Sequence, residues 1–562
     1  MTVSSAFQAW QTAQAAAKTG DADAARQALK EGLAAFPEDS SFRNSAGSLF
    51  QKMGDMEEAE TQFGKALALK PEALDIAINH AISLAGLDRH IDALAVLQRY
   101  EAEGSRSALY SSTRGMVARG QGNKVEAARW YDRALALEPV RPKALHGRAR
   151  VALERGETDA LAWFDKALSV NQGDADLWLG KAQSLDVAGD VVGARAIAES
   201  LVQQAPQWSE GLRFLAQLRL ASGDRDFTSH YGDAAERVPQ DPNIYAEWCG
   251  ILAGLDYHQE AANVASRGSV LFPKLEHFRL LQATYIGAAG DSEQADKLYS
   301  TLELDTPERR LNEARHRIRR AEYSEADKLL DTLLTSDSES VAAWALRGLL
   351  WRVTQAPEAG WLHEQAELVQ LVPLKRAGEV LENIIPALHR LHDNSPLPLG
   401  QSLRGGSQTR GNLFDRHEAV FQQLGDAVRD TVEQFRQSLP GHDSAHPLLR
   451  YRDLDWNVAG SWSVRLAGGG DYHISHIHPQ GIVSSALYLE LPEETENEDK
   501  AGWLEIGRPP PDLRLELEPL RTIEPKVGYM ALFPSTLYHG TRAFSHQQRM
   551  TVAFDVTATQ TC

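Results

Sequence analysis

Three histidines near the end of the chain could hold a metal ion. His476 and His478 are separated by one residue, and His539 lies further along the chain. Residues i and i+2 of a strand face the same side, so we expect His476 and His478 to point together into the fold while Ile477 points away. Neutral imidazoles are good ligands for a divalent first-row metal. The spacing therefore predicts a metal site that His539 completes.

An arginine that follows the last of these histidines could bind an anion. Arg549 comes ten residues after His539 and opens a stretch with the composition of a strand, in which Thr551 should lie on the same face. A guanidinium can hold a carboxylate through two parallel hydrogen bonds. A lone arginine is more often a surface ion-pair partner, but its position relative to the histidines favours an anion site beside the metal.

The composition is that of a globular protein with several domains. The chain has 562 residues, of which 43% are hydrophobic and 24% charged. Its formal net charge of −19 argues against nucleic acid and anionic membranes as partners. Only two cysteines occur, Cys249 and Cys562, so a disulfide framework or a thiolate zinc site is excluded. The N-terminal residues do not resemble a signal peptide and no apolar run is long enough to span a membrane, so we expect a cytoplasmic protein.

The first two-thirds of the chain repeats itself. Prolines recur at intervals close to 34 residues or twice that number, from Pro37 to Pro273, and glycines follow nearly the same interval. In one unit, Phe50 and Phe63 are expected to fill the space between two helices, and Gly47 to let these helices approach closely. This pattern predicts an all-α solenoid of helical hairpins.

The period and residue types resemble the tetratricopeptide repeat over residues 5–356. The resemblance implies a solenoid whose concave face binds an extended peptide or a helix of another protein. A passive spacer or an oligomerisation arm is the alternative.

The pattern changes after the repeats. Residues 357–411 are expected to form bridging helices and a linker rich in proline and glycine, and Asn412 to cap a helix that ends near Leu439. Short strands are expected at 450–456, 461–466, 472–478, 482–491, 502–506, 527–533 and 550–556. Such strands suit a jelly-roll barrel with a metal inside one open end, so residues 412–562 are expected to form an α+β domain.

The C-terminal motifs resemble those of the iron(II)- and 2-oxoglutarate-dependent oxygenases, in a bacterial branch that is prolyl-hydroxylase-like and commonly fused to tetratricopeptide repeats. The resemblance covers about residues 400–557 and is carried by the stretches 476–481, 484–489, 502–507 and 532–539. It implies a double-stranded β-helix (jelly roll), with Fe(II) and 2-oxoglutarate as cofactors. By resemblance, the three histidines would hold the iron. The far carboxylate of 2-oxoglutarate would pair with Arg549, with hydroxyl hydrogen bonds from Thr551 and Tyr488.

The sequence departs from that family at one ligand. Most members have an aspartate or glutamate where this chain has His478. Either three histidines bind the iron, or another group such as Asp471 or Glu505 completes the coordination sphere. His473 lies three residues before His476, on the opposite face of an ideal strand, and is a less favoured ligand.

Three further residues are candidates for a substrate pocket. Trp462 and Arg465 lie in one expected strand, where barrel packing and a surface charge are the simpler interpretations. Gln408 belongs to a polar, glycine-rich stretch that is expected to cover the barrel mouth.

Three functions are compatible with this sequence. The leading hypothesis is a hydroxylase that acts on a protein or peptide captured by the solenoid. A cupin-type dioxygenase with three histidines and no 2-oxoglutarate is the first alternative, in which Arg549 has no role. The second is a repeat scaffold with a degenerate, non-catalytic barrel. The substrate, which could also be a small molecule, is not defined by the sequence.

Overall fold

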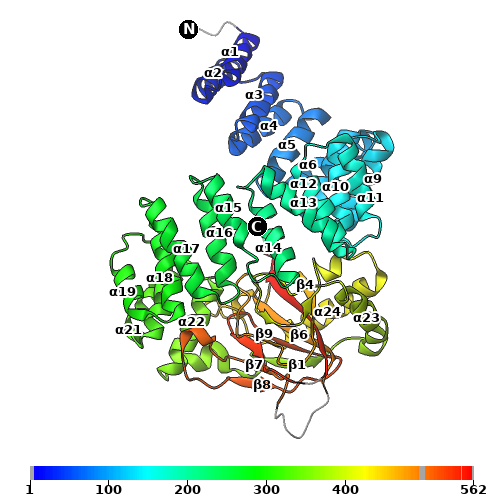
Figure 1. Ribbon diagram of the computed structural model, residues 1–562. Helices are drawn as coiled ribbons and strands as arrows, with labels where there is room; N and C mark the ends of the chain where they lie inside the picture. Colours follow the sequence, from blue (N-terminus) through cyan, green and yellow to red (C-terminus); the bar gives the residue numbers. More distant parts are fainter. Residues whose placement is uncertain (1–4, 493–499, 546, 560–562) are drawn as a thin grey trace. The chain divides into compact units, whose positions relative to one another are not determined.

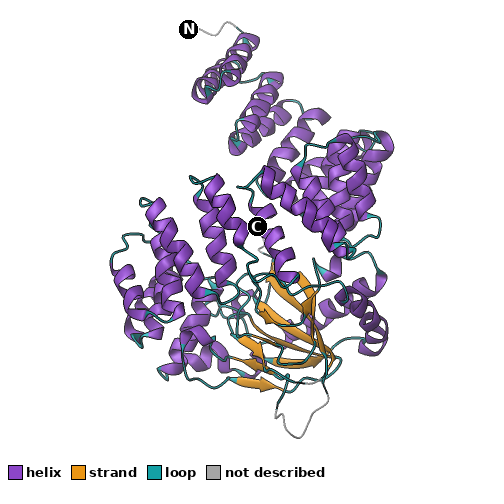
Figure 2. Cartoon of the chain, viewed as in Figure 1, coloured by secondary structure: helices purple, strands orange, loops and turns teal. Residues whose placement is uncertain are grey.

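The computed structural model describes residues 5–492, 500–545 and 547–559, in two compact units that divide after Ser184. Helices dominate most of the chain, and the strands lie near its C-terminal end (Figures 1 and 2). The expected fold class, a helical solenoid followed by a β-rich domain, is confirmed. In the described part of the chain, no helix is both long and apolar enough to cross a membrane.

The first unit is a succession of antiparallel helix pairs. Close approach within a pair depends on small residues: a Cβ on Gly47 would lie 2.9 Å from the ring of Phe63, and Gly115 meets Tyr131 in the same way. The expected alternation of small and large residues between paired helices is therefore present. The helices are α1 (Ala6–Lys18), α2 (Ala22–Ala35), α3 (Ser40–Lys52), α4 (Met56–Leu69), α5 (Leu74–Gly86), α6 (His90–Gln98), α7 (Glu101–Gly104), α8 (Ala108–Gly120), α9 (Lys124–Leu137), α10 (Pro142–Glu154), α11 (Ala160–Val170) and α12 (Ala175–Val187), in which the division falls.

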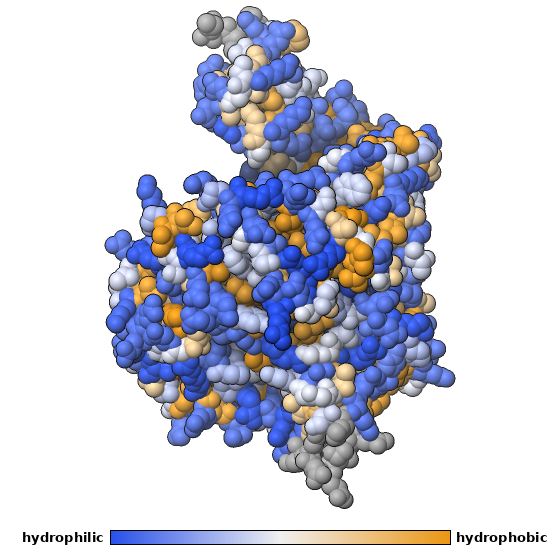
Figure 3. Space-filling view, viewed as in Figure 1, coloured by the Kyte–Doolittle hydropathy of each residue, from blue (hydrophilic) through white to orange (hydrophobic). Residues whose placement is uncertain are grey.

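The second unit begins with helices of the same kind and continues into the β-rich domain. Its repeat helices are α13 (Val191–Gln204), α14 (Ser209–Ala221), α15 (Ser229–Arg237), α16 (Pro242–Ala253), α17 (His258–Leu271), α18 (His277–Ala289), α19 (Ser292–Ser300), α20 (Pro307–Arg319), α21 (Tyr323–Ser336) and α22 (Val341–Val353). On the face drawn in Figure 3, hydrophilic side chains predominate and apolar ones are interspersed, as expected of a chain with this net charge.

The strands of the described residues form one large and two small sheets. The large sheet has the order β1-β9-β6-β11-β4-β3, and the small ones are β10-β7-β8 and β2-β5. The strands are β1 (Gln370–Pro373), β2 (Leu403–Arg404), β3 (Ser407–Gln408), β4 (Trp456–Leu466), β5 (Tyr472–His473), β6 (Val483–Glu490), β7 (Leu504–Ile506), β8 (Arg521–Ile523), β9 (Tyr529–Pro534), β10 (His539–Thr541) and β11 (Arg549–Ala558).

Several expected elements differ from the structure. The expected strand at 450–456 is wrong, because residues 449–451 form a 3-10 turn and β4 begins only at Trp456. Asn412 caps a 3-10 turn, and helix α24 (Ala419–Ser438) begins six residues later than expected. The segment 357–411, expected to bridge and link, contains helix α23 (Ala377–His392) and also supplies β1 and β3 to the large sheet. Pairing with strands far along the chain decides these details.

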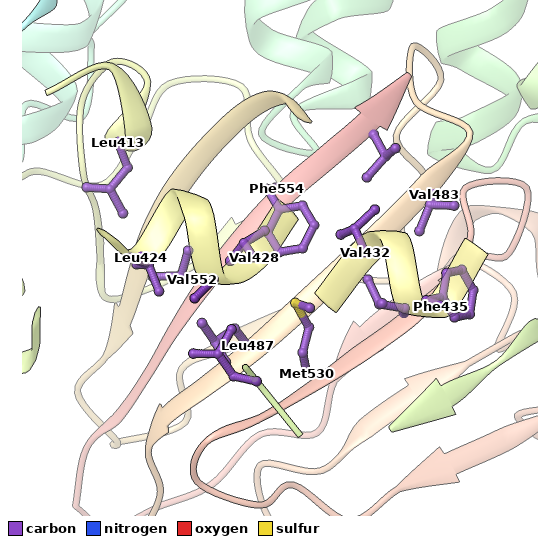
Figure 4. Close-up of a cluster of buried hydrophobic side chains, with 14 of the residues drawn as sticks. Leu413, Leu424, Val428, Val432, Phe435, Val483, Leu487, Met530, Val552 and Phe554 are labelled. Carbon is purple, nitrogen blue, oxygen red and sulfur yellow. The ribbon is translucent and has the colours of Figure 1, made fainter. Parts of the chain in front are cut away.

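Side-chain alternation gives the large sheet two apolar faces. Helices α23 and α24 cover one face, where the side chains of Leu487, Met530 and Phe554 pack beneath α24 (Figure 4). Residues one position away, such as Tyr488 and Ala531, belong to a second cluster that includes residues of β7. Positions 549, 551, 553 and 555 of β11 therefore share the face turned away from the helices, which is the face that lines the site.

Candidate metal centre

The three histidines expected to bind a metal converge on one point. Each of His476, His478 and His539 offers a ring nitrogen, and these nitrogens all lie within 4.8 Å of one another. The Nε2 atoms of His476 and His478 are 3.0 Å apart. Neutral imidazoles can share a cation at such a point, so the donor set fits a divalent first-row metal.

Backbone pairing brings the third histidine to the first two. His476 and His539 form an isolated antiparallel bridge, with N–H donors 3.0 Å and 2.9 Å from the opposite carbonyl oxygens. Gly540 makes this approach possible, since a Cβ there would lie 2.8 Å from the carbonyl oxygen of His473 and 3.1 Å from the nitrogen of Ser475. A glycine next to the ligand is therefore required by close backbone contact.

Hydrogen bonds orient each imidazole with its Nε2 towards the centre. The Nδ1 of His476 lies 2.8 Å from the carbonyl oxygen of Ile474, and that of His539 lies 3.1 Å from the carbonyl oxygen of Leu537. The Nδ1 of His478 donates instead to the carboxylate of Asp555. These acceptors favour the tautomer with the proton on Nδ1, which leaves the Nε2 lone pairs free to bind a metal.

Burial keeps two of these rings neutral. It lowers the pKa of His476 to about 3 and holds the pKa of His539 well below its ordinary value, with the neighbouring histidines acting in the same direction. Neutral imidazole is the form that binds a metal, so these rings need not lose a proton first at physiological pH.

Beside the histidines lies a buried arginine without a counter-ion. Arg549 is 2% exposed, and in the described part of the chain no carboxylate lies within ion-pair distance and its Nε makes no hydrogen bond. Its guanidinium lies 5.4 Å from the ring centroid of Tyr488, whose hydroxyl is also buried without a hydrogen bond among the described residues. Burial lowers the pKa of Arg549 and raises that of Tyr488 to about 12. A buried cation without a partner is costly, so this geometry fits an anionic ligand.

The arginine and the histidines line one inner cavity of about 50 Å³. Thr551 also lines it, as expected from its spacing to Arg549. An anion held by Arg549 would thus lie in the same cavity as the metal ligands.

The candidate pocket residues divide into two groups. Trp462 and Gln408 line the inner cavity, and the Trp462 ring lies 5.5 Å from that of His478. Arg465 does not line this cavity, so the structure supports its simpler interpretation as a surface charge and not its candidacy for the pocket. It is an odd number of residues from Trp462, on the opposite face of β4, where its Nη1 lies 3.3 Å from the carboxylate of Asp393.

The alternative carboxylates lie outside the cluster of three histidines. Asp471 accepts a hydrogen bond of 2.9 Å from the backbone nitrogen of Ala467, and Glu505 pairs with Arg508. His473 also lines the inner cavity, contrary to the expectation that it lies on the opposite face, because the backbone after β5 leaves regular strand geometry.

Asp555 is a residue of the site that was not predicted from the sequence. It shares the inner face of β11 with Arg549 and Thr551, and its carboxylate accepts the hydrogen bond from His478. The same two-residue alternation that related Arg549 to Thr551 could have identified it.

A second, larger cavity of about 1150 Å³ opens beside the metal ligands. His476, His478 and Trp462 line it together with residues of helices α18 and α20, among them Thr284 and Asn312. The repeat helices and the β-rich domain thus share one cavity next to the candidate metal site.

The last repeats also contact the segments that carry the metal ligands. Arg315 of α20 donates 2.7 Å hydrogen bonds to both carboxylate oxygens of Asp512 and a 3.0 Å bond to the hydroxyl of Tyr538, the residue before His539. Ile477, between the other two ligands, packs against the apolar cluster of α20, α21 and α22. The side chains next to the ligands are therefore anchored in the solenoid.

The structure is that of a helical-repeat protein with a β-rich domain that carries a candidate metal site. Residues 460–555 match the family described as "Putative 2OG-Fe(II) oxygenase". Residues 11–73, 44–108, 112–169 and 158–218 match tetratricopeptide repeat families. Both parts of the expected fusion, the tetratricopeptide repeats and a putative 2OG-Fe(II) oxygenase domain, are thus found by family models. This family implies Fe(II) and 2-oxoglutarate as cofactors.

The alignments with individual relatives cover only part of this chain, and in one case only part of the relative. Protein FlbA of Caulobacter vibrioides is 30% identical over 143 residues, 25% of this chain and 24% of FlbA, so the chain spans about a quarter of that relative. Among solved structures, PilW, a type IV pilus biogenesis factor, is 22% identical, with 36% of this chain and 96% of PilW covered and a TM-score of 0.34. Yeast Tom70 is 14% identical, with 63% of this chain and 97% of Tom70 covered and a TM-score of 0.29. We draw no functional argument from these structural likenesses.

Proposed function

We propose that this protein is an iron(II)- and 2-oxoglutarate-dependent hydroxylase that acts on a side chain of a protein or peptide bound by its repeats. The observation that carries the proposal is the combination in one cavity of three converging imidazoles and a buried arginine that has no counter-ion among the described residues. The first group suits Fe(II), and the second suits the far carboxylate of a 2-oxo dicarboxylic acid.

Each residue has a defined part in this proposal. His476, His478 and His539 hold the metal, and Arg549 pairs with the co-substrate carboxylate. Thr551 lines the same cavity and the ring of Tyr488 lies beside the Arg549 guanidinium, so in this proposal their hydroxyls add hydrogen bonds to that carboxylate. When bound, the iron centre supplies oxidation of a substrate C–H bond by dioxygen, with conversion of 2-oxoglutarate to succinate and carbon dioxide.

The larger cavity supports a polypeptide as the substrate. Its lining includes the amide side chains of Asn312, Gln401, Gln408 and Gln480, which make no side-chain hydrogen bond in the described part of the chain. A primary amide both donates and accepts hydrogen bonds, which matches the peptide groups of an extended chain. Since helices of the solenoid also line this cavity, a segment bound by the repeats would lie next to the metal ligands, at a raised effective concentration.

The test compares two arginine variants of the full chain. Arg549→Ala should weaken 2-oxoglutarate binding to the Mn(II)-loaded protein by roughly 30- to 1000-fold, because a buried charge pair that loses one partner costs about 2–4 kcal/mol. Calorimetry measures this binding, and succinate release with Fe(II) and candidate peptides measures turnover. Arg465→Ala is the matched control and should bind like wild type, because this residue faces away from the cavity. Unchanged binding by Arg549→Ala, with no succinate from any peptide, would refute the proposal.

A cupin-type dioxygenase that needs no oxo-acid is the second candidate, and the three-histidine donor set favours it. That function leaves Arg549 without a role, which is why we rank it lower. Oxygen consumption that is the same with and without 2-oxoglutarate would support it.

A cytoplasmic location, and the exclusion of nucleic acid and membranes as partners, remain predictions from the sequence.

A further inference from the structure

The candidate metal site lacks a carboxylate ligand, but a carboxylate lies directly behind one of its histidines. In the described part of the chain, the group of side chains that could hold a metal consists of His476, His478 and His539. Three neutral imidazoles leave the double positive charge of a divalent cation uncompensated, whereas a coordinating carboxylate would cancel one unit.

The three histidines differ in what holds their outer nitrogen. Backbone carbonyl groups accept the Nδ1 hydrogen bonds of His476 and His539, and the carboxylate of Asp555 accepts that of His478. His478 is also the histidine that stands where the resembling family usually has an aspartate or glutamate. The carboxylate of Asp555 is therefore hydrogen-bonded to His478, the ligand position at which a negatively charged side chain is replaced by a neutral one.

Packing fixes this pair in place. The Trp462 ring lies against the His478 ring, with centroids 5.5 Å apart and planes inclined by 42°. Asp555 lies on β11 between β4 and β6, opposite Gly460 and Ser484, and the side chains of His478 and Asp555 are 13% and 22% exposed. A hydrogen bond formed between two partly buried, packed side chains can orient the imidazole and increase the electron density on its Nε2.

We infer that Asp555 is a positioning residue that takes over, through His478, the charge-balancing role of the missing carboxylate ligand. The inference rests on the proposed metal centre and deepens it. Asp555 holds His478 with its proton on Nδ1, aims Nε2 at the cation and adds one negative charge behind the ligand. The site is then a three-histidine centre with a carboxylate in its outer shell.

The first experiment measures metal affinity without co-substrate or turnover. Mn(II) or Co(II) is titrated into the metal-free full chain by calorimetry, for wild type and for Asp555→Asn, which keeps the shape and an acceptor oxygen but removes the charge. We expect the dissociation constant to rise by about 10- to 100-fold, the usual effect of losing such a partner. The Co(II) absorption spectrum should also change, because the imidazole is held differently.

Matched carboxylates provide the controls. Asp471→Asn and Glu505→Gln should keep wild-type affinity, since the wild-type carboxylates pair with Ala467 and Arg508 rather than with a metal ligand. The metal-free unfolding midpoint of Asp555→Asn should stay close to that of wild type, which separates a weakened site from a misfolded domain.

A double-mutant cycle tests whether Asp555 acts through His478. His478→Asp restores a carboxylate at the ligand position, so Asp555→Asn should no longer weaken metal binding in that background. The inference fails if Asp555→Asn binds metal like wild type. It also fails if Asp555→Asn lowers metal affinity by the same factor in the wild-type and His478→Asp backgrounds. Absence of metal binding by the wild-type protein would instead overturn the metal centre, and with it the proposed function.

Discussion

The hydroxyl of Tyr488 offers a direct test of whether the pocket beside the metal ligands is built for an anion. Tyr488 is fully buried, and its hydroxyl makes no hydrogen bond in the described part of the chain. A buried hydroxyl without a partner costs about 1–3 kcal/mol. Tyr488→Phe removes this group and keeps the ring, so we expect the ligand-free protein to gain about 1–2 kcal/mol in its free energy of unfolding. Urea unfolding followed by tryptophan fluorescence measures the gain.

The same substitution should weaken binding of the co-substrate 2-oxoglutarate. A hydrogen bond to a charged group contributes about 1.5–3 kcal/mol, which corresponds to roughly 10- to 100-fold in affinity. The dissociation constant of 2-oxoglutarate for the Mn(II)-loaded protein should therefore rise by that factor. The variant would be more stable when empty and bind its co-substrate less tightly, a combination that a purely structural tyrosine does not produce.

Tyr231 supplies the control. It is also fully buried in the same unit, with a hydroxyl that makes no hydrogen bond among the described residues, but it lies on helix α15. Tyr231→Phe should gain stability and bind 2-oxoglutarate like wild type. If Tyr488→Phe instead loses stability and binds 2-oxoglutarate unchanged, the hydroxyl serves packing and the argument for an anion pocket is wrong.

Two further predictions concern the glycine beside the metal ligands and the buried histidines. Gly540→Ala should weaken Mn(II) binding measured by calorimetry, because the added Cβ would lie 2.8 Å from the carbonyl oxygen of His473 and separate the two segments that carry the ligands. Acid should destabilise the second unit, since burial lowers the pKa of His363 and of His392 to about 3, whereas the unfolded value is about 6.5. The unfolded chain then binds more protons, so stability falls as the pH drops from about 6.5 towards 3, by about 2 kcal/mol per histidine at pH 5 in urea titrations.

Controls exist for both predictions. Gly250→Ala, in helix α16, adds a Cβ with no atom within 4 Å and should leave Mn(II) affinity unchanged. An equal effect of both glycine substitutions would contradict the close-contact argument. For the acid effect, His392→Asn should reduce the loss of stability between pH 7.5 and pH 5, and a wild-type stability that is constant over this range would disprove the assignment.

Local pattern was enough to predict much of the architecture. The 34-residue period and the small residues facing Phe63 and Tyr131 predicted the solenoid, because each hairpin packs mainly on its neighbours in the sequence. Strand alternation correctly related Arg549 to Thr551 on β11, since a two-residue period needs no knowledge of the partner strand. The expected strand 472–478 is wrong, because β5 ends at His473, and His476 and His478 face one point through an isolated bridge instead. The resemblance to the oxygenase family rested on these same short motifs.

Long-range pairing decided what the local pattern left open. The bridge between residues 476 and 539 brings the third imidazole to the first two, and β11 carries Asp555 to the back of His478. β1 joins the sheet from a segment expected to form bridging helices, because its partner β9 lies about 160 residues away. Contacts between segments so far apart depend on how the elements pack, which no local spacing specifies. For this reason the sequence by itself predicted the three histidines of the candidate metal site, and only the tertiary structure revealed the carboxylate behind His478.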